Sequence, residues 1–297
     1  TEQDKLLYCL CRPQRLLDVS HNYIVFDDGE KKIARYQQYF AIRESLGRIK
    51  ETDSNGKRTG GVIWHTQGSG KSLTMVMLAE QISTVVKEPQ IIMVTDRIDL
   101  DDQIAGTFKK CGMDVRQATS GRNLVDLLNT EKDVVITTVI HKFESAVNQA
   151  DAILKSGDIF ILVDEGHRTQ YGQFNVKMRK MFPNACFIAF TGTPLMKAEK
   201  NTATKFGGII GSPYTITDAV KDKAVVPLLY EGRMNLIDVN ARPLDNYFGQ
   251  VSDPLSEYGK GQLKRKFSRL DIINKADLVI YERAIDIVKN FCDNFQL

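Results

Sequence analysis

The chain has 297 residues, of which 42% are hydrophobic and 26% are charged, and its formal net charge is +3. These values are ordinary for a soluble globular protein, and the length suffices for one large or two medium domains. So small a net charge excludes any argument for nucleic-acid binding from the total alone, because an electrostatic footprint depends on how charges cluster.

Two further features point to a cytoplasmic protein. No apolar run is long enough to span a bilayer and no signal-peptide pattern opens the chain, so we expect no membrane partner. The five cysteines are odd in number and lack the C-x-x-C spacing, which favours reduced thiols. The four histidines are scattered, so a metal cluster is not expected. The first residue is Thr1, which is compatible with a piece of a longer protein.

Short apolar runs alternate with amphipathic stretches over residues 60–195. The runs predicted as strands are 62–64, 91–94, 134–136, 159–163 and 187–190, and those predicted as helices are 72–86 and 100–110. Apolar strands joined by helical crossovers indicate a parallel sheet covered on both faces. The sequence therefore predicts a doubly wound α/β domain, with ligands at the carboxyl ends of its strands.

The pattern changes after residue 227. Residues 227–239 are predicted to be extended, and 240–260 to be loop-like. Residues 276–295 are predicted to form an amphipathic helix, with Leu278, Ile285, Val288 and Phe291 near one face.

The stretch "WHTQGSGKS" (64–72) is typical of a phosphate-binding loop, although His65 stands where glycine is usual. Small residues let backbone N–H groups approach phosphates, a lysine adds charge, and a hydroxyl ligates Mg²⁺. The turn of Gly68, Ser69 and Gly70, followed by Lys71 and Ser72, meets these needs between a predicted strand and a predicted helix. The alternative is a Gly/Ser turn that precedes Lys-Ser by chance.

The predicted strand 159–163 leads into two carboxylates, Asp164 and Glu165. In P-loop enzymes the first carboxylate helps to hold Mg²⁺ and the second orients the attacking water. His167 would then link the nucleotide state to other parts of the protein. The alternative is an acidic turn at the end of a strand.

These motifs together resemble those of superfamily 2 helicases and translocases. The resemblance rests on D-E-x-H, on the loop at Lys71 and on "FTGTPL" (190–195), where Thr191 and Thr193 would couple hydrolysis to movement. "ARYQQYFAI" (34–42) resembles the adenine-reading segment of that superfamily, which makes Gln38 the expected adenine contact. Two stretches, 94–104 and 136–143, resemble segments that touch the nucleic-acid backbone. The residues implied there are Arg97, Gln103, Thr138 and Lys142.

The surrounding text is more specific still. "DRIDLDDQ", "DEGHRTQYG" and "YTITDAVKDKAVVPLLYEGR" closely resemble the restriction (R) subunit of type I restriction-modification enzymes over essentially the whole chain. The resemblance implies a RecA-like P-loop domain with a parallel sheet flanked by helices, plus a C-terminal connector segment. It also implies ATP and Mg²⁺ as cofactors, translocation of double-stranded DNA, and methyltransferase and specificity subunits as partners.

The same resemblance suggests a domain plan. Residues 1–50 would carry the adenine-reading motif, 51–230 the first RecA-like domain, and 231–297 a connector toward a second motor domain. No Q-x-x-G-R motif occurs in the sequence. An arginine finger typically contributes about 10³–10⁵ in rate, so we expect slow ATP turnover by this chain alone.

Three other functions stay open: another superfamily 2 helicase or remodeller, a small-molecule P-loop kinase, and a non-catalytic nucleotide-binding module. The basic run 260–269 is interpreted either as a contact with DNA phosphates or as a solvated helix face. Glu30-Lys31-Lys32 is expected in a polar turn rather than in a nuclease site. Asp101 and Asp102 are expected at the start of a helix.

Overall fold

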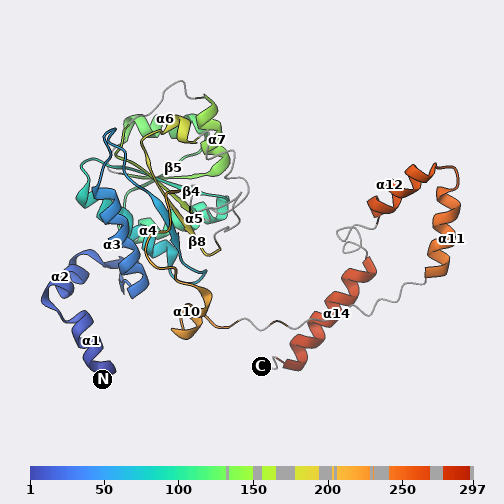
Figure 1. Ribbon diagram of the computed structural model, residues 1–297, viewed down its shortest axis with the longest axis horizontal. Coiled ribbons are helices and arrows are strands. Elements are labelled where there is room, and N and C mark those ends of the chain that lie inside the picture. Colours follow the sequence, from blue (N-terminus) through green and yellow to red (C-terminus); the bar gives the residue numbers. More distant parts are fainter. Residues whose placement is uncertain are drawn as a thin grey trace. The chain divides into compact units, whose positions relative to one another are not determined.

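The computed structural model describes residues 1–131, 134–149, 156–164, 178–193, 203, 206–227, 230, 241–267 and 277–294. The chain divides into two compact units, Thr1–Pro227 and Leu228–Leu297 (Figure 1). Among the described helices, none has the length and apolar character needed to cross a membrane.

The first unit opens with helices and a hairpin. Their bounds are α1 Glu2–Leu10, α2 Pro13–Asn22, β1 Ile24–Asp27, β2 Glu30–Ile33 and α3 Tyr36–Lys50. The antiparallel strands β1 and β2 turn at Asp28 and Gly29, whose φ angles are 53° and 83°. Asp-Gly is a favoured pair for such a turn, so the second strand starts at once. The polar turn expected at Glu30–Lys32 is therefore wrong, because these residues lie on β2.

Six parallel strands form the large sheet. They are β3 Gly61–Trp64, β4 Gln90–Thr95, β5 Val115–Gln117, β6 Val135–Val139, β7 Ile159–Asp164 and β8 Cys186–Thr191. Their order is β3-β8-β7-β4-β6-β5, and every pairing is parallel. The predicted parallel α/β fold is confirmed. Strand β5 escaped prediction because its sequence, Val-Arg-Gln, contains no apolar run.

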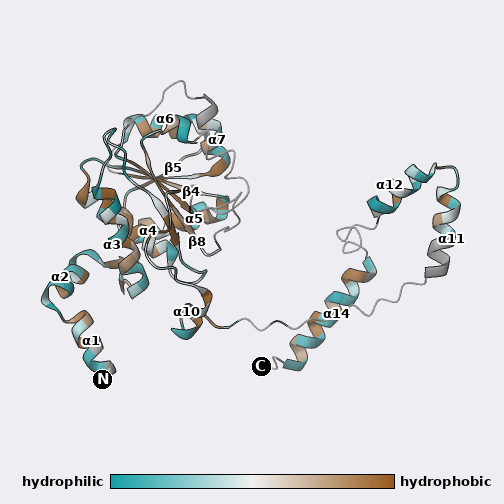
Figure 2. Ribbon diagram, viewed as in Figure 1, coloured by the Kyte–Doolittle hydropathy of each residue, from teal (hydrophilic) through white to brown (hydrophobic). Residues whose placement is uncertain are grey.

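Helices cover both faces of this sheet. On one face, α3, α4 (Lys71–Val85) and α5 (Ile98–Lys110) pack in one apolar cluster with strand residues such as Ile63 and Phe190. On the other face, α6 (Gly121–Thr130) and α7 (Ile140–Gln149) pack with alternate strand residues such as Val62 and Ala189. The strands are hydrophobic along most of their length, whereas the covering helices show both characters (Figure 2). Burial on both faces explains why the strands are continuously apolar.

Helix α10 (Ile216–Lys221) lies near the end of the first unit. The second unit contains α11 Ala241–Ser252, α12 Glu257–Phe267 and α14 Asp277–Asn294. The helix expected at 276–295 is confirmed. The loop expected at 240–260 is wrong: two helices occupy most of it, and the break between them holds Asp253-Pro254, a pair that disfavours helix. Of the extended segment expected at 227–239, all but Pro227 and Tyr230 lie outside the described residues.

Candidate nucleotide-binding site

The loop between β3 and α4 has the backbone that its sequence predicts. Gly68 and Gly70 have φ angles of 77° and 89°, in the left-handed region that favours glycine. A Cβ atom on Gly68 would lie 2.9 Å from a methyl of Val225, and one on Gly70 would lie 2.9 Å from the amide nitrogen of Gln38. The left-handed backbone therefore favours glycine at both positions, and a Cβ atom at either one would also make a neighbouring side chain shift.

Helix α4 begins at Lys71 directly after this turn. Gly70 is its N-cap and supplies no side-chain hydrogen bond, so the N-terminus of α4 presents backbone N–H groups and a favourable dipole to an anion. Lys71 and Ser72 are half-buried in the first turn of the helix. Ser69 is buried and donates its hydroxyl to the Thr66 carbonyl at 2.6 Å, which stabilises the loop itself. This arrangement can bind a phosphate chain.

Two neighbouring strands end beside the loop. Asp164 is the last residue of β7 and is paired in register with Phe190 of β8. Strand β8 also pairs with β3, the strand that leads into the loop. The fold thus brings Asp164 and Thr191 to the same sheet edge as the phosphate loop. Glu165 and His167 lie outside the described residues.

The segment after β8 is hydrogen-bonded to the loop. The His65 N–H donates to the Thr191 carbonyl at 3.0 Å, and the Trp64 indole N–H donates to the Gly192 carbonyl at 3.1 Å. The Thr193 N–H donates to the Thr191 hydroxyl at 3.1 Å. A change in the conformation of the loop would therefore act directly on residues 191–193 through these hydrogen bonds.

The residues present suit Mg²⁺. The Ser72 hydroxyl and the Asp164 carboxylate are oxygen ligands, which Mg²⁺ prefers, and Mg²⁺ usually binds through one or two protein ligands together with substrate phosphates and water. Among the described residues, no group of three or more His, Cys, Asp and Glu side chains could hold a metal ion. A site of this kind depends on a bound nucleotide for its remaining ligands.

Gln38 lies against the loop. Its amide nitrogen donates to the Gly70 carbonyl at 2.9 Å and to the Thr74 hydroxyl at 3.1 Å. Its amide oxygen accepts the Arg35 N–H at 2.8 Å. The side chain is 4% exposed. Gln38, for which an adenine contact is predicted, is thus hydrogen-bonded to the loop and to the first turn of α4.

His65 occupies an apolar interior position. It is 1% exposed, and its ring meets that of Tyr214 edge to face, with centroids 6.0 Å apart. Burial, followed by the charge of Lys71, lowers the pKa of the His65 imidazole from 6.5 to about 4. Among the described residues its Nδ1 atom has no hydrogen-bond partner. His65 is therefore neutral at physiological pH.

The residues expected to touch DNA lie at the same sheet edge, beyond the neighbouring strands β4 and β6. Arg97 starts α5 with its side chain 60% exposed, and Gln103 is exposed on the same helix. Lys142 on α7 donates to the Ala118 carbonyl at 3.0 Å. The Thr138 side chain is fully buried in β6 and is inaccessible to a ligand. Of these side chains, Arg97 and Gln103 are exposed, whereas Lys142 is partly buried.

The family model described as SWI2/SNF2 ATPase matches residues 37–260, which is most of the chain. The chain belongs to the SWI2/SNF2 ATPase family. Membership accounts for the parallel sheet and the phosphate loop together, and it makes nucleotide use a property of the family to which this ATPase domain belongs.

Curated relatives of this SWI2/SNF2 ATPase confirm the resemblance inferred from its motifs. The type I restriction enzyme HindI endonuclease subunit of Haemophilus influenzae is 33% identical, over 99% of this chain and 30% of its own length. The putative type I restriction enzyme MjaIXP endonuclease subunit of Methanocaldococcus jannaschii is 29% identical, over 100% and 29%. The chain therefore spans less than a third of the length of these relatives.

Among solved structures, a nuclease-deletion mutant of the Type ISP restriction-modification enzyme LlaGI in complex with a DNA substrate mimic is 16% identical. It aligns with a TM-score of 0.49 over 76% of this chain and 23% of its own.

Two residues far along the chain contact the phosphate loop of this SWI2/SNF2 ATPase, and the sequence did not predict either contact. Tyr214 pairs with the loop through its backbone, and Val225 packs over Gly68. The stretch "YTITDAV", which contains Tyr214, contributed to the family resemblance. Nothing in its sequence predicts which earlier residues it contacts.

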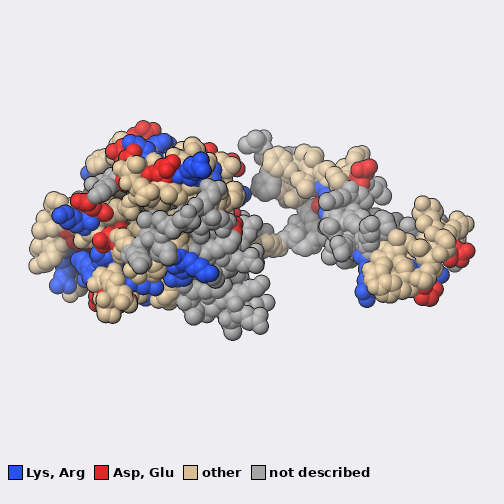
Figure 3. Space-filling model, turned by 90° about the horizontal axis from the view of Figure 1, so that it is seen from above, with Lys and Arg blue, Asp and Glu red and all other residues tan. Residues whose placement is uncertain are grey.

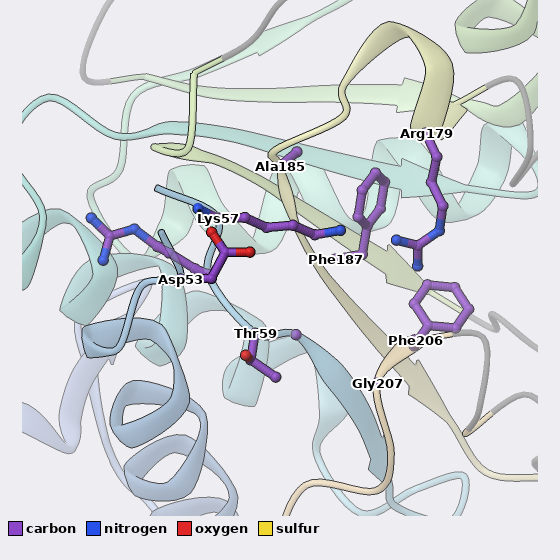
Figure 4. Close-up of a pocket in the computed structure, with 10 residues that line it drawn as sticks. Asp53, Lys57, Thr59, Arg179, Ala185, Phe187, Phe206 and Gly207 are labelled. Carbon is purple, nitrogen blue, oxygen red and sulfur yellow. Dashed lines mark hydrogen bonds between the residues drawn. The ribbon is translucent and has the colours of Figure 1, made fainter. Parts of the chain in front are cut away.

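A pocket lies at the opposite edge of the sheet, where β3 and β8 begin. Its volume is about 350 Å³, and the Arg179 guanidinium lies over the Phe187 ring, 4.6 Å from its centroid (Figure 4). No predicted site residue lines it.

On the face drawn in Figure 3, basic and acidic side chains intermingle over the first unit, so the described surface there shows no single-sign patch.

Proposed function

We propose that this chain is the ATP-hydrolysing motor of a type I restriction endonuclease subunit, and that it translocates double-stranded DNA. The names of the curated relatives and the family membership support this proposal. The observation that carries it is the shared sheet edge. A phosphate loop, a strand ending in Asp164, and the exposed Arg97 all lie there.

In the proposed reaction, Lys71 stabilises charge on the β- and γ-phosphates, while the α4 N-terminus binds their oxygens. Ser72 and Asp164 would hold Mg²⁺, which when bound neutralises phosphate charge. Glu165 would orient the attacking water, and His167 would respond to the nucleotide state. Thr191 and Thr193 would transmit that state, because their segment is hydrogen-bonded to the loop.

The proposed DNA contacts are sequence-independent. Arg97, Gln103 and Lys142 would bind phosphates, which position a protein on a duplex without reading bases. Thr138 would contribute through its main chain, since its side chain is buried. Sequence recognition would belong to a specificity subunit, acting with a methyltransferase subunit in the cytoplasm. Residues 51–230 would be the first RecA-like domain and 231–297 the connector.

Substitution of Lys71 tests the nucleotide site. Loss of a charge-assisted contact should weaken ATP–Mg²⁺ binding by about 10- to 100-fold in Lys71→Ala, as measured by calorimetric titration. Lys87→Ala is the matched control, because Lys87 is exposed just past the far end of α4. An unchanged affinity in Lys71→Ala would overturn the proposed ATPase site and favour a non-catalytic module.

Salt titration tests the DNA contacts. The logarithm of the DNA-binding constant falls linearly with the logarithm of the salt concentration, and each lost phosphate contact should reduce the steepness of this line by about 1. Arg97→Ala should therefore show a shallower salt dependence of duplex binding than the wild type. Lys87→Ala should keep the wild-type slope. A preference for single-stranded over duplex DNA would instead favour another superfamily 2 helicase.

A further inference from the structure

The pocket of about 350 Å³ at the amino ends of β3 and β8 takes no part in the proposed reaction. It lies at the other end of the two strands that lead to the phosphate loop and to Thr191. Three cationic side chains and one carboxylate line it, namely Lys57, Arg58, Arg179 and Asp53. Sites for small molecules occupy about 300–1,000 Å³. The pocket therefore has the size and the charge to hold a small anion.

Two of these four charged groups serve the local structure. The Arg58 guanidinium forms an ion pair with the Asp158 carboxylate at 2.7 Å. One oxygen of the Asp53 carboxylate accepts two backbone N–H groups of its own turn, both at 2.9 Å. The remaining cations of the lining are Lys57 and Arg179.

Lys57 is held by its backbone and open at its side chain. Its N–H donates to the Asp53 carboxylate at 2.9 Å, and its carbonyl accepts the Asp53 N–H at 2.9 Å. The side chain is half-buried, and no carboxylate of the described residues lies within the ion-pair distance of 4.0 Å from its ammonium group. The turn thus places an ammonium group at the pocket without neutralising it.

Arg179 approaches the same space from a different part of the chain. Its guanidinium is stacked over the ring of Phe187, which is buried, and the ring of Phe206 is buried in the same lining. Burial lowers the pKa of the Arg179 guanidinium from its usual value, because water is partly excluded from the charge. Figure 4 shows Lys57 and Arg179 extending toward each other on either side of the Phe187 ring. An anion between them would be attracted with less screening than at an exposed surface.

We propose that this pocket binds the phosphate group of a small phosphorylated ligand, at a site separate from the phosphate loop. Lys57 and Arg179 supply the two positive charges, and the exposed Thr59 supplies a hydroxyl donor. A phosphate monoester carries a charge of about −1.5 to −2 at pH 7, which two cations match. The planar fork of an arginine also fits two phosphate oxygens at once. A carboxylate side chain of a partner protein would bring only one charge.

The test uses inorganic pyrophosphate as the probe. It is titrated calorimetrically into the full chain carrying Lys71→Ala, in which binding at the phosphate loop is weakened. Adding Lys57→Gln should weaken pyrophosphate binding by about 10- to 100-fold, because a charge-assisted contact is lost. Adding Lys57→Arg should retain most of the affinity, because the charge is kept. Lys180→Gln is the matched control and should change nothing, because Lys180 follows Arg179 but is exposed and does not line the pocket.

Three results would overturn the site. The first is an equal pyrophosphate affinity with and without Lys57→Gln, or no binding to the Lys71→Ala chain at all. The second is binding of a hexaglutamate peptide that depends on Lys57 while pyrophosphate does not bind, which would make the pocket a docking site for a protein. The third is a loss of duplex-DNA affinity in Lys57→Gln with pyrophosphate affinity kept. Thermal melts should show that Lys57→Gln folds like its parent, since Lys57 is bonded to Asp53 through its backbone. Should it not fold, Thr59→Val tests the same pocket, and an unchanged pyrophosphate affinity there would contradict the proposal.

Discussion

At the residue scale, His65 shows how environment decides chemistry. As a letter in the sequence it is a departure from the usual first glycine of a phosphate loop. In the structure it is an interior side chain, packed edge to face with Tyr214 and shielded from water. Its imidazole is kept neutral by burial, so it adds no positive charge beside Lys71. At the first position of the loop, His65 thus contributes packing against Tyr214.

The lowered pKa of His65 makes stability depend on pH. Between about pH 6.5 and pH 4 the unfolded chain binds a proton at this residue that the folded chain does not. Folding stability should therefore fall as pH drops through this window, by at most about 3 kcal/mol. Urea unfolding at pH 7.5, 6 and 5 should show this loss in the wild type and a smaller one in His65→Gln. His141→Gln, at an exposed imidazole, should behave like the wild type, and an equal loss in all three proteins would contradict the assignment to His65.

At the scale of elements, two helical glycines show why the same residue type has different uses. Gly106 lies inside α5, and a Cβ atom there would meet nothing within 4 Å. Gly121 is the first residue of α6, and a Cβ atom there would lie 2.5 Å from the Ala146 nitrogen of α7. The first position only lowers helix propensity, whereas the second lets two helices of the same face approach closely.

Opposite stability changes are expected at these glycines. Gly106→Ala should stabilise the protein by about 0.5–1 kcal/mol, because alanine restricts the unfolded chain and favours helix. Gly121→Ala should destabilise it by about 1–3 kcal/mol, because the methyl group would push α6 from α7. Chemical denaturation of the two variants measures both values. A stabilising Gly121→Ala would show that the contact between α6 and α7 is looser than described.

At the scale of the whole molecule, the apolar core belongs to the first unit. Both core clusters draw all their residues from positions up to Ile210, and the sheet ends with β8. Residues 212–225 add no strand to it, but they contact the phosphate loop through Tyr214 and Val225. Core and loop support are thus supplied by different stretches of the same unit.

Truncation separates these two contributions. A chain of residues 1–227 should unfold cooperatively and bind ATP–Mg²⁺ with the affinity of the full chain, because the core and the segment on the loop are both retained. A chain ending at residue 211 should keep the sheet and lose ATP affinity. Calorimetric titration and thermal melts measure both properties. If residues 1–227 fail to fold, the first unit depends on residues beyond 227.

Much of the fold and part of the site could be predicted from local patterns. Continuous apolar runs predicted the long buried strands, and the glycine spacing before Lys71 predicted the turn between β3 and α4. Strand β5 was not predicted, because three residues are too few to show a periodic pattern. Helices α11 and α12 were predicted as loop, because their sequences contain Gly and Pro residues that are typical of loops. Asp164 was placed correctly because it follows a buried strand without a break.

The sequence by itself determined the local order of elements along the chain, namely a strand, a glycine turn and a helix that together can bind phosphate. Only the tertiary structure decided which side chains surround that loop. Residues 212–225 return to it across some 150 positions, where Tyr214 packs edge to face against His65 and Val225 packs over Gly68. Local spacing specifies backbone geometry, but the hydrogen-bond partners of a side chain depend on which distant segments fold against it.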